Sequence, residues 1–220
     1  MRIRLACWVA LVAAIAALNY AARFTGGNTS SNARNAVYSY ATFANGVVVY
    51  LLWLGLVLAI AIDRRDLLAL RRPHSWGAAG RLVVGAVLAI YALEAVVSAL
   101  PLPQSPSKEQ GLTPTHWEPA HAGAFAANVV LFALIAPVVE ELTFRGLGQS
   151  LLSFVGRWPS FVLVGLAFGL AHGLLEALVV LVPFGIALAW LRNRTESVYP
   201  GMIVHALFDG LALAFSVIHP

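Results

Sequence analysis

The stretch of sequence that decides the fold is AGAFAANVVLFALIAPVVEELTFRGLGQSLLSF, residues 122–154. Its charges are confined to a cluster formed by Glu140, Glu141 and Arg145. As one helix it would extend about 50 Å, whereas the hydrocarbon of a bilayer is about 30 Å thick. We therefore expect it to tilt, to kink at Pro137 or to extend into the cytoplasm. Because charged side chains in hydrocarbon are costly, the cluster indicates a functional site.

The rest of the chain is similarly apolar. Of its 220 residues, 60% are hydrophobic and 11% are charged, whereas a soluble domain would carry about 25% charged residues. The composition predicts an integral membrane protein in contact with the lipid bilayer. The sequence pI of about 9.6 does not indicate nucleic-acid binding, because Lys and Arg in membrane proteins mainly record orientation. The single cysteine, Cys7, excludes an internal disulfide and a cysteine-only metal site.

Apolar segments divide the chain into membrane-spanning candidates, each of which needs roughly 20 residues. They lie at about 3–22, 37–62, 80–100, 122–154, 159–174, 175–191 and 198–218, and the fifth is short. We therefore predict an all-α fold, a polytopic membrane helix bundle of about seven transmembrane helices. Without a convincing internal repeat or second domain, residues 1–220 are expected to form a single integral membrane domain. The helices that carry the charged cluster and its partners lie at about 122–218.

The basic residues predict how the chain is threaded. With the N-terminus in the cytoplasm, 11 of the 14 Lys and Arg residues fall on the inner side and 3 on the outer side. Without Arg145, which lies within the membrane, the count is 10 against 3. The first apolar segment could be a cleaved signal peptide, but the cleavage site around Ala17 to Ala21 is poor, so we favour an uncleaved helix. The alanine-rich segments suggest a bacterial inner membrane.

Glu140 is expected to meet His172 inside the membrane. If Gly156 is the turn between two antiparallel helices, Glu140 lies 16 residues before it and His172 lies 16 residues after it. Equal offsets place both residues roughly 24 Å along their helices from the turn. Phe168 lies one turn before His172, where packing explains it best, and the small residue Gly169 permits close approach of helices.

Two further pairs have helical spacing. Glu141 and Arg145 are four residues apart and share a helix face, while Glu140 points about 100° away. Arg145 can neutralise Glu141 and leave Glu140 to face the histidine, although the pair could equally be a helix-stabilising ion pair. His205 and Asp209 are also four apart. A carboxylate beside an imidazole fixes its tautomer or holds it positively charged, but this pair could also simply join helices.

Three motifs resemble those of a known family. The run Glu140-Glu-Leu-Thr-Phe-Arg-Gly146 resembles EExxxR, the first motif of the CAAX prenyl endopeptidase and bacteriocin-processing (Abi) family. Phe168-Gly-Leu-Ala-His172 resembles its second motif, FxxxH, and His205-Ala-Leu-Phe-Asp209 resembles its third, Hxxx followed by Asn or Asp. All three occur in order within predicted helices, over about 70 residues from 140 to 209.

The resemblance implies an intramembrane glutamic endopeptidase, a protease built from several transmembrane helices. Glu140 would be the base that activates the hydrolytic water, helped by His172. His205 and Asp209 would stabilise the oxyanion or its neighbours. Asp209 departs from members that have Asn here, because an ionised Asp cannot donate a hydrogen bond to an oxyanion. A role in polarising His205 is therefore more plausible for it.

Glu141 and Arg145 would, by the same resemblance, shape the site. Amide hydrolysis needs a base for water and electrostatic stabilisation of the oxyanion, which these residue types can supply. The alternative is a zinc mechanism, since two histidines and a glutamate are acceptable ligands. The chain has no HExxH helix, so we favour metal-free catalysis without a cofactor.

The predicted function is hydrolysis of a peptide bond near the C-terminus of a membrane-anchored protein substrate. That substrate would be lipid-modified or would carry a C-terminal sorting helix. A non-catalytic bacteriocin immunity or self-protection protein is the alternative, because the family has members linked to bacteriocin resistance. A proton-coupled transporter is a third reading, less attractive because no repeat is visible.

Overall fold

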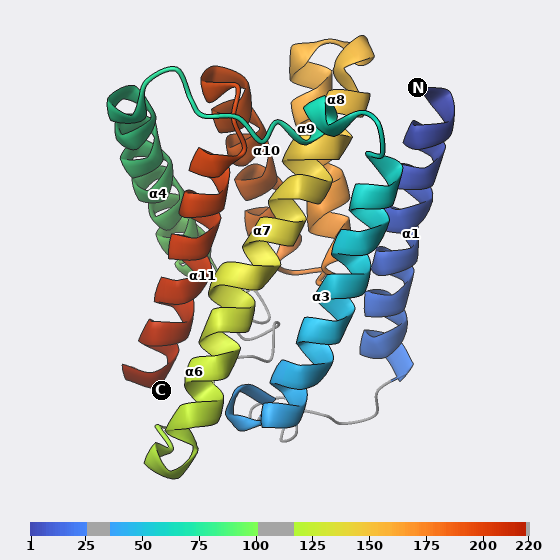
Figure 1. Cartoon of the computed structure of the whole chain (residues 1–220). Coiled ribbons are helices and arrows are strands. Elements are labelled where there is room, and N and C mark those ends of the chain that lie inside the picture. Colours follow the sequence, from blue (N-terminus) through green and yellow to red (C-terminus); the bar gives the residue numbers. More distant parts are fainter. Residues whose placement is uncertain (26–35, 101–116, 219–220) are drawn as a thin grey trace.

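The described part of the chain, residues 1–25, 36–100 and 117–218 of the computed structural model, is a bundle of helices without a strand (Figure 1). α1 begins at one end of the bundle and α11 ends at the opposite end (Figure 1). Short 3-10 turns lie between or beside the helices at Ala36–Tyr38, Arg65–Leu68, Pro119–His121 and Ser153–Val155. Apart from a long composite helix, the helices are α1 (Arg2–Thr25), α3 (Tyr40–Ile60), α4 (Trp76–Ser98), α9 (Arg157–Ala171), α10 (Leu178–Thr195) and α11 (Tyr199–Ile218).

Six helices in the described residues are long and apolar enough to cross a membrane. A seventh, α9, is also apolar but has only 15 residues. The predicted all-α fold of about seven helices is confirmed. The fifth predicted segment, 159–174, is short as expected and corresponds to α9. The chain is therefore an integral membrane protein.

The long composite helix runs obliquely across the bundle (Figure 1), as expected for a helix longer than the bilayer is thick. Two π-helical stretches interrupt its α-helical geometry, and Pro137 lies in the first turn after one of them. A π-turn can accommodate the hydrogen bond that proline removes from a helix. In order, the segments are α6 (Ala122–Val130), the π-helical η4 (Leu131–Ile135), α7 (Ala136–Glu141), the π-helical η5 (Leu142–Gly148) and α8 (Gln149–Leu151).

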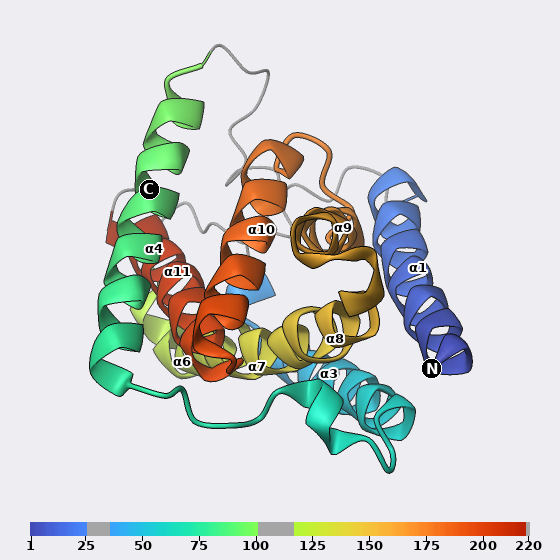
Figure 2. The ribbon, with the colours of Figure 1, turned by 90° about the horizontal axis from the view of Figure 1, so that it is seen from above.

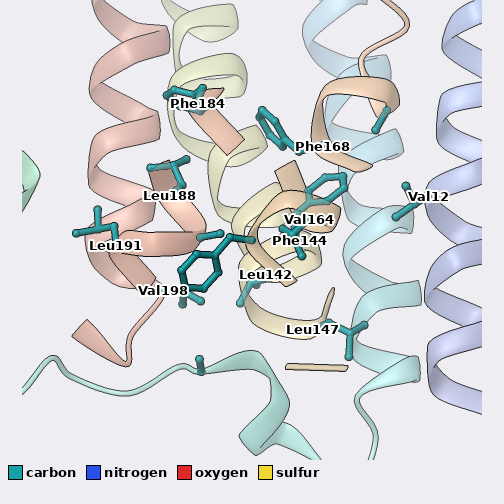
Figure 3. Close-up of a cluster of buried hydrophobic side chains, with 14 of the residues drawn as sticks. Val12, Leu142, Phe144, Leu147, Val164, Phe168, Phe184, Leu188, Leu191 and Val198 are labelled. Atoms are coloured by element: carbon teal, nitrogen blue, oxygen red, sulfur yellow. The ribbon is translucent and has the colours of Figure 1, made fainter. Parts of the chain in front are cut away.

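The hydrophobic core surrounds η5, α9 and α10. Phe144, Phe168 and Phe184 are fully buried and converge there with leucine and valine side chains (Figure 3). α9 and α10 pack closely because glycines face each other. A Cβ added at Gly185 would lie 2.7 Å from the Cα of Gly165. Small residues at such an interface allow membrane helices to approach closely, and this fixes the end of α9 relative to η5.

The connection between α3 and α4 crosses the end of the bundle at which α1 begins (Figure 2). Its residues Leu67, Leu68 and Ala69 are buried in the core. The backbone N–H of Val198 donates to the carbonyl of Ala69 over 3.2 Å. A Cβ at Gly146 would lie 2.8 Å from the carbonyl oxygen of Leu68. This connection therefore covers η5 and the start of α11 from that end.

Candidate active site

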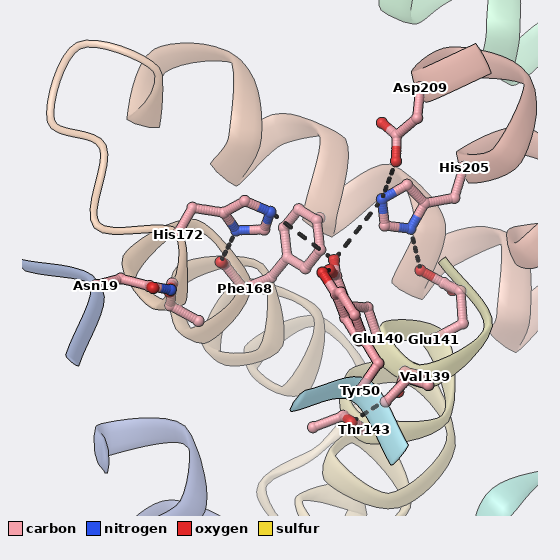
Figure 4. Close-up of polar contacts among 12 residues, drawn as sticks. Asn19, Tyr50, Val139, Glu140, Glu141, Thr143, Phe168, His172, His205 and Asp209 are labelled. Atoms are coloured by element: carbon pink, nitrogen blue, oxygen red, sulfur yellow. Dashed lines mark hydrogen bonds and ion pairs between the residues drawn. The ribbon is translucent and has the colours of Figure 1, made fainter. Parts of the chain in front are cut away.

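Glu140 lies between two imidazoles from different helices (Figure 4). It is in α7, and its side chain is almost fully buried. Its Oε2 lies 3.8 Å from Nε2 of His172 and 3.8 Å from Nε2 of His205. Its Oε1 accepts a hydrogen bond of 3.0 Å from the hydroxyl of Tyr50. The structure thus brings Glu140 and His172 together as their spacing around Gly156 predicted.

His172 directly follows the last residue of α9 and is its C-cap. Its Nδ1 lies 2.8 Å from the carbonyl oxygen of Phe168. A carbonyl only accepts, so Nδ1 is the donor. In the neutral imidazole the lone pair is then on Nε2, the nitrogen that faces Glu140. The backbone of α9 thereby sets the tautomer of this histidine.

The chain reverses direction after His172, and this turn packs against α1. Gly173 has φ +69°, a left-handed conformation that favours glycine, and a Cβ there would lie 2.8 Å from Asn19. The amide of Asn19 donates to the carbonyl of Ala171 over 2.7 Å. α1 therefore holds the end of α9, and with it the position of His172.

Glu141 and Arg145 form the ion pair that their spacing predicted. Nη1 of Arg145 donates to Oε1 of Glu141 over 2.7 Å, and both side chains are fully buried. The Arg145 guanidinium also lies over the ring of Phe168, 4.3 Å from its centroid, and donates to the carbonyl of Gly185. Such a pair is costly to break, because the remaining charge would be left without a partner.

Glu141 also contacts His205, which sequence spacing did not indicate. Nδ1 of His205 donates to Oε1 of Glu141 over 3.2 Å. α11 can pass this close because residue 201 is glycine: a Cβ there would lie 2.6 Å from Oε2 of Glu141. One carboxylate therefore orients both the arginine of the first motif and the histidine of the third.

Nε2 of His205 is surrounded by acidic groups. It lies 3.5 Å from Oδ2 of Asp209, the partner predicted one turn away, and 3.8 Å from Oε2 of Glu140. With Nδ1 on Glu141, both ring nitrogens face carboxylates. This arrangement suits the imidazolium form, in which both nitrogens donate.

Phe168 packs between the polar groups, as predicted. Its ring centroid lies 4.5 Å from that of His172 and 5.6 Å from that of His205. Phe184 lies 5.1 Å from His205 on another side. These rings hold the imidazoles in place and keep the site in an apolar surrounding.

The site has an accessible edge. The side chain of His172 is 24% exposed and that of Asp209 is 28% exposed, compared with 9% for Glu140 and 4% for His205. Glu140 and His172 also face a pocket of about 130 Å³ between the helices that carry the motifs and the N-terminal helices α1 and α3. The pocket is lined by Ile15, Asn19, Tyr50, Trp53, Glu140, Phe144, Ala171 and His172.

Two residues that contact the site, Tyr50 and Asn19, come from helices without a motif. Tyr50 belongs to α3 and Asn19 to α1, and neither was predicted as a site residue. The sequence indicated them only weakly: Tyr50 and Asn19 are each a polar residue at the centre or end of an apolar segment. Tyrosine and asparagine at such places are also common in helix packing.

Within the part of the chain that the structure describes, no group of three His, Cys, Asp or Glu side chains is arranged to hold a metal ion. Zinc would require ligand atoms at about 2.0–2.2 Å from a common centre. Metal-free catalysis stays a prediction, which cleavage in the presence of a chelator would test.

The geometry is that of a buried cluster of carboxylates, imidazoles and a guanidinium inside a membrane-helix bundle. Residues 122–211 match the family model described as Type II CAAX prenyl endopeptidase Rce1-like. The match contains all six predicted site residues and leaves out α1, α3 and α4. No curated protein and no solved structure matches the chain.

The match covers the region of the three motifs and agrees with the resemblance that those motifs showed. At the level of the family, this match supports a CAAX-type intramembrane protease.

Proposed function

We propose that this chain hydrolyses a peptide bond near the C-terminus of a membrane-anchored protein, with Glu140 as the base. The observation that carries the proposal is the convergence of Glu140 Oε2 and two imidazole Nε2 atoms, each 3.8 Å away, beside a pocket. A base, a second acceptor for water and a cation for the oxyanion are the groups that amide hydrolysis needs.

Glu140 and His172 would activate the water. A water molecule beside both groups can donate one hydrogen bond to the carboxylate and one to the Nε2 lone pair of His172. Glu140 takes a proton as the water oxygen bonds to the scissile carbonyl carbon, and the carbonyl electron pair moves to oxygen. The oxyanion electron pair then re-forms the carbonyl as the C–N bond breaks with its electron pair on nitrogen, and Glu140 gives its proton to that leaving nitrogen. The products are a new carboxyl terminus and an amine.

His205 would stabilise the oxyanion as a donor. As an imidazolium it can offer its Nε2–H, while the Glu141 contact at Nδ1 fixes the ring. Asp209 supports the positive charge of His205 instead of binding the oxyanion, because a carboxylate has no proton to donate. Removing one such donor typically costs about 10²–10³-fold in rate.

The substrate is a membrane-anchored protein that is lipid-modified or carries a C-terminal sorting helix. Support comes from the position of the site within the apolar bundle and from the family match. The distribution of 10 against 3 basic residues supports a cytoplasmic N-terminus, and the alanine-rich apolar segments favour a bacterial inner membrane.

The test uses the full chain purified in detergent and two peptides. One peptide ends in a prenylated CAAX sequence, and the other ends in an unmodified apolar helix. Mass spectrometry of the products should show a single cleavage near the C-terminus of at least one peptide. Failure to cleave any membrane-anchored substrate, together with retained protection against a bacteriocin, would favour the non-catalytic immunity function instead.

A further inference from the structure

The hydroxyl of Tyr50 is the hydrogen-bond donor to the carboxylate of Glu140, and it comes from outside the family match. Its oxygen lies 3.0 Å from Oε1 of Glu140. Oε2 is buried and has no hydrogen-bond partner among the described residues. The two carboxylate oxygens are therefore in different environments: one is held by a phenol, and the other faces the imidazoles.

This asymmetry matters because a carboxylate turns easily. The last torsion of a glutamate side chain is broad and roughly two-fold, so the side chain alone does not fix where its oxygens point. A hydrogen bond at Oε1 selects the orientation in which Oε2 lies 3.8 Å from both Nε2 atoms. Without that bond, the carboxylate can rotate away from the position that the proposed water needs.

The ring of Tyr50 is itself held. It stacks on Trp53, with centroids 5.6 Å apart and planes at 12°. Trp53 in turn meets Phe144 edge-on, with centroids 6.5 Å apart and planes at 85°. Phe144 belongs to η5, the segment that directly follows the two glutamates, and is fully buried. Aromatic contacts of this geometry are favourable and fix the hydroxyl relative to Glu140.

We propose that Tyr50 is a positioning residue, which orients the Glu140 carboxylate for proton transfer. The inference rests on the proposed function, in which Glu140 is the base. Tyr50 lies in α3, so this helix would help to position Glu140 although it lies outside the motifs and outside the family match. Supporting groups that hold a reacting side chain within about 0.5 Å are needed for efficient catalysis.

The experiment compares Tyr50→Phe with wild type, because Phe keeps the stacked ring and removes only the hydroxyl. Tyr20→Phe is the matched control, since the hydroxyl of Tyr20 is buried without a hydrogen-bond partner in the described structure. For each variant, kcat and KM are measured on one membrane peptide, together with the thermal unfolding midpoint in detergent. Glu140→Gln is measured in parallel.

We expect Tyr50→Phe to lower kcat about 10- to 100-fold, as for loss of orientation in a proton transfer. KM should change by less than about twofold, and the unfolding midpoint should fall only modestly below that of Tyr20→Phe, because Glu140 Oε1 loses its donor. An unchanged kcat would overturn the inference, as would a loss of kcat that a raised KM and a large drop in the midpoint accompany, which would indicate a structural role. If Glu140→Gln cleaves at the wild-type rate, the proposed function itself fails.

Discussion

His205 Nδ1 and Glu141 Oε1 lie 3.2 Å apart, which joins the third motif directly to the first. The same Glu141 oxygen accepts the 2.7 Å hydrogen bond from Arg145. One buried carboxylate therefore links a cation on its own helix to an imidazole on α11. The two acidic residues of the EExxxR run thus have different surroundings: Glu140 faces the two imidazoles and the pocket, and Glu141 holds Arg145 and His205.

Glu141→Gln should destabilise the protein and reduce its activity. The substitution leaves the fully buried Arg145 without its counter-charge, which typically costs about 3–5 kcal/mol. Thermal unfolding in detergent measures the loss. Asp66→Asn is the control, because its ion pair with Arg64 is exposed and should contribute little. Equal midpoints for the two variants would contradict the structural role assigned to the Glu141–Arg145 pair.

Asp209→Asn tests what the carboxylate beside His205 does. Asp209 lies 3.5 Å from Nε2 of His205, and removing its charge weakens support for the imidazolium. We expect kcat to fall about tenfold with the fold retained, as measured by steady-state cleavage and unfolding. An equal or higher kcat in the Asn variant would show that a hydrogen-bond donor is preferred at this position.

Gly185→Ala should destabilise the α9–α10 contact. The added methyl group would lie 2.7 Å from the Cα of Gly165, a backbone atom that cannot move aside freely. Overpacking of this kind typically costs about 1–3 kcal/mol. Gly80→Ala on α4 is the matched control, since nothing lies within 4 Å of its added Cβ. There, helix propensity should make the change neutral or stabilising by about 0.5–1 kcal/mol. A Gly185→Ala protein as stable as wild type would refute this packing.

Chelation tests whether the site works without a metal. With Glu140 and His172 activating water, wild-type cleavage should continue at its full rate in a strong chelator of zinc. Product formation after prolonged dialysis against the chelator measures this. Loss of cleavage that zinc restores would instead assign Glu140 and the two histidines as metal ligands.

The sequence predicted the contacts that follow from the geometry of one helix or of two adjoining helices. Glu141 with Arg145 and His205 with Asp209 are each one turn apart, so helical spacing alone places them together. Glu140 and His172 followed from equal distances to the turn at Gly156. These predictions needed no knowledge of how the other helices are rotated.

Contacts between helices that are distant in the chain could not be predicted in this way. The Tyr50–Glu140 and Glu141–His205 contacts depend on the rotation and crossing angle of α3 and α11 against the composite helix. The π-helical stretches η4 and η5 change that rotation around the glutamates. Apolar patterning does not encode these angles, because lipid-facing and core-facing residues are both apolar.

The rate of peptide cleavage by Glu140→Gln tests most directly whether Glu140 is the base. Glutamine keeps the size of the side chain and can still meet Tyr50, but it cannot accept a proton from water as a carboxylate does. We predict a loss of about 10²–10⁴-fold in kcat, with an unfolding midpoint close to that of wild type. Cleavage by Glu140→Gln at the wild-type rate would contradict the role of Glu140 as the base.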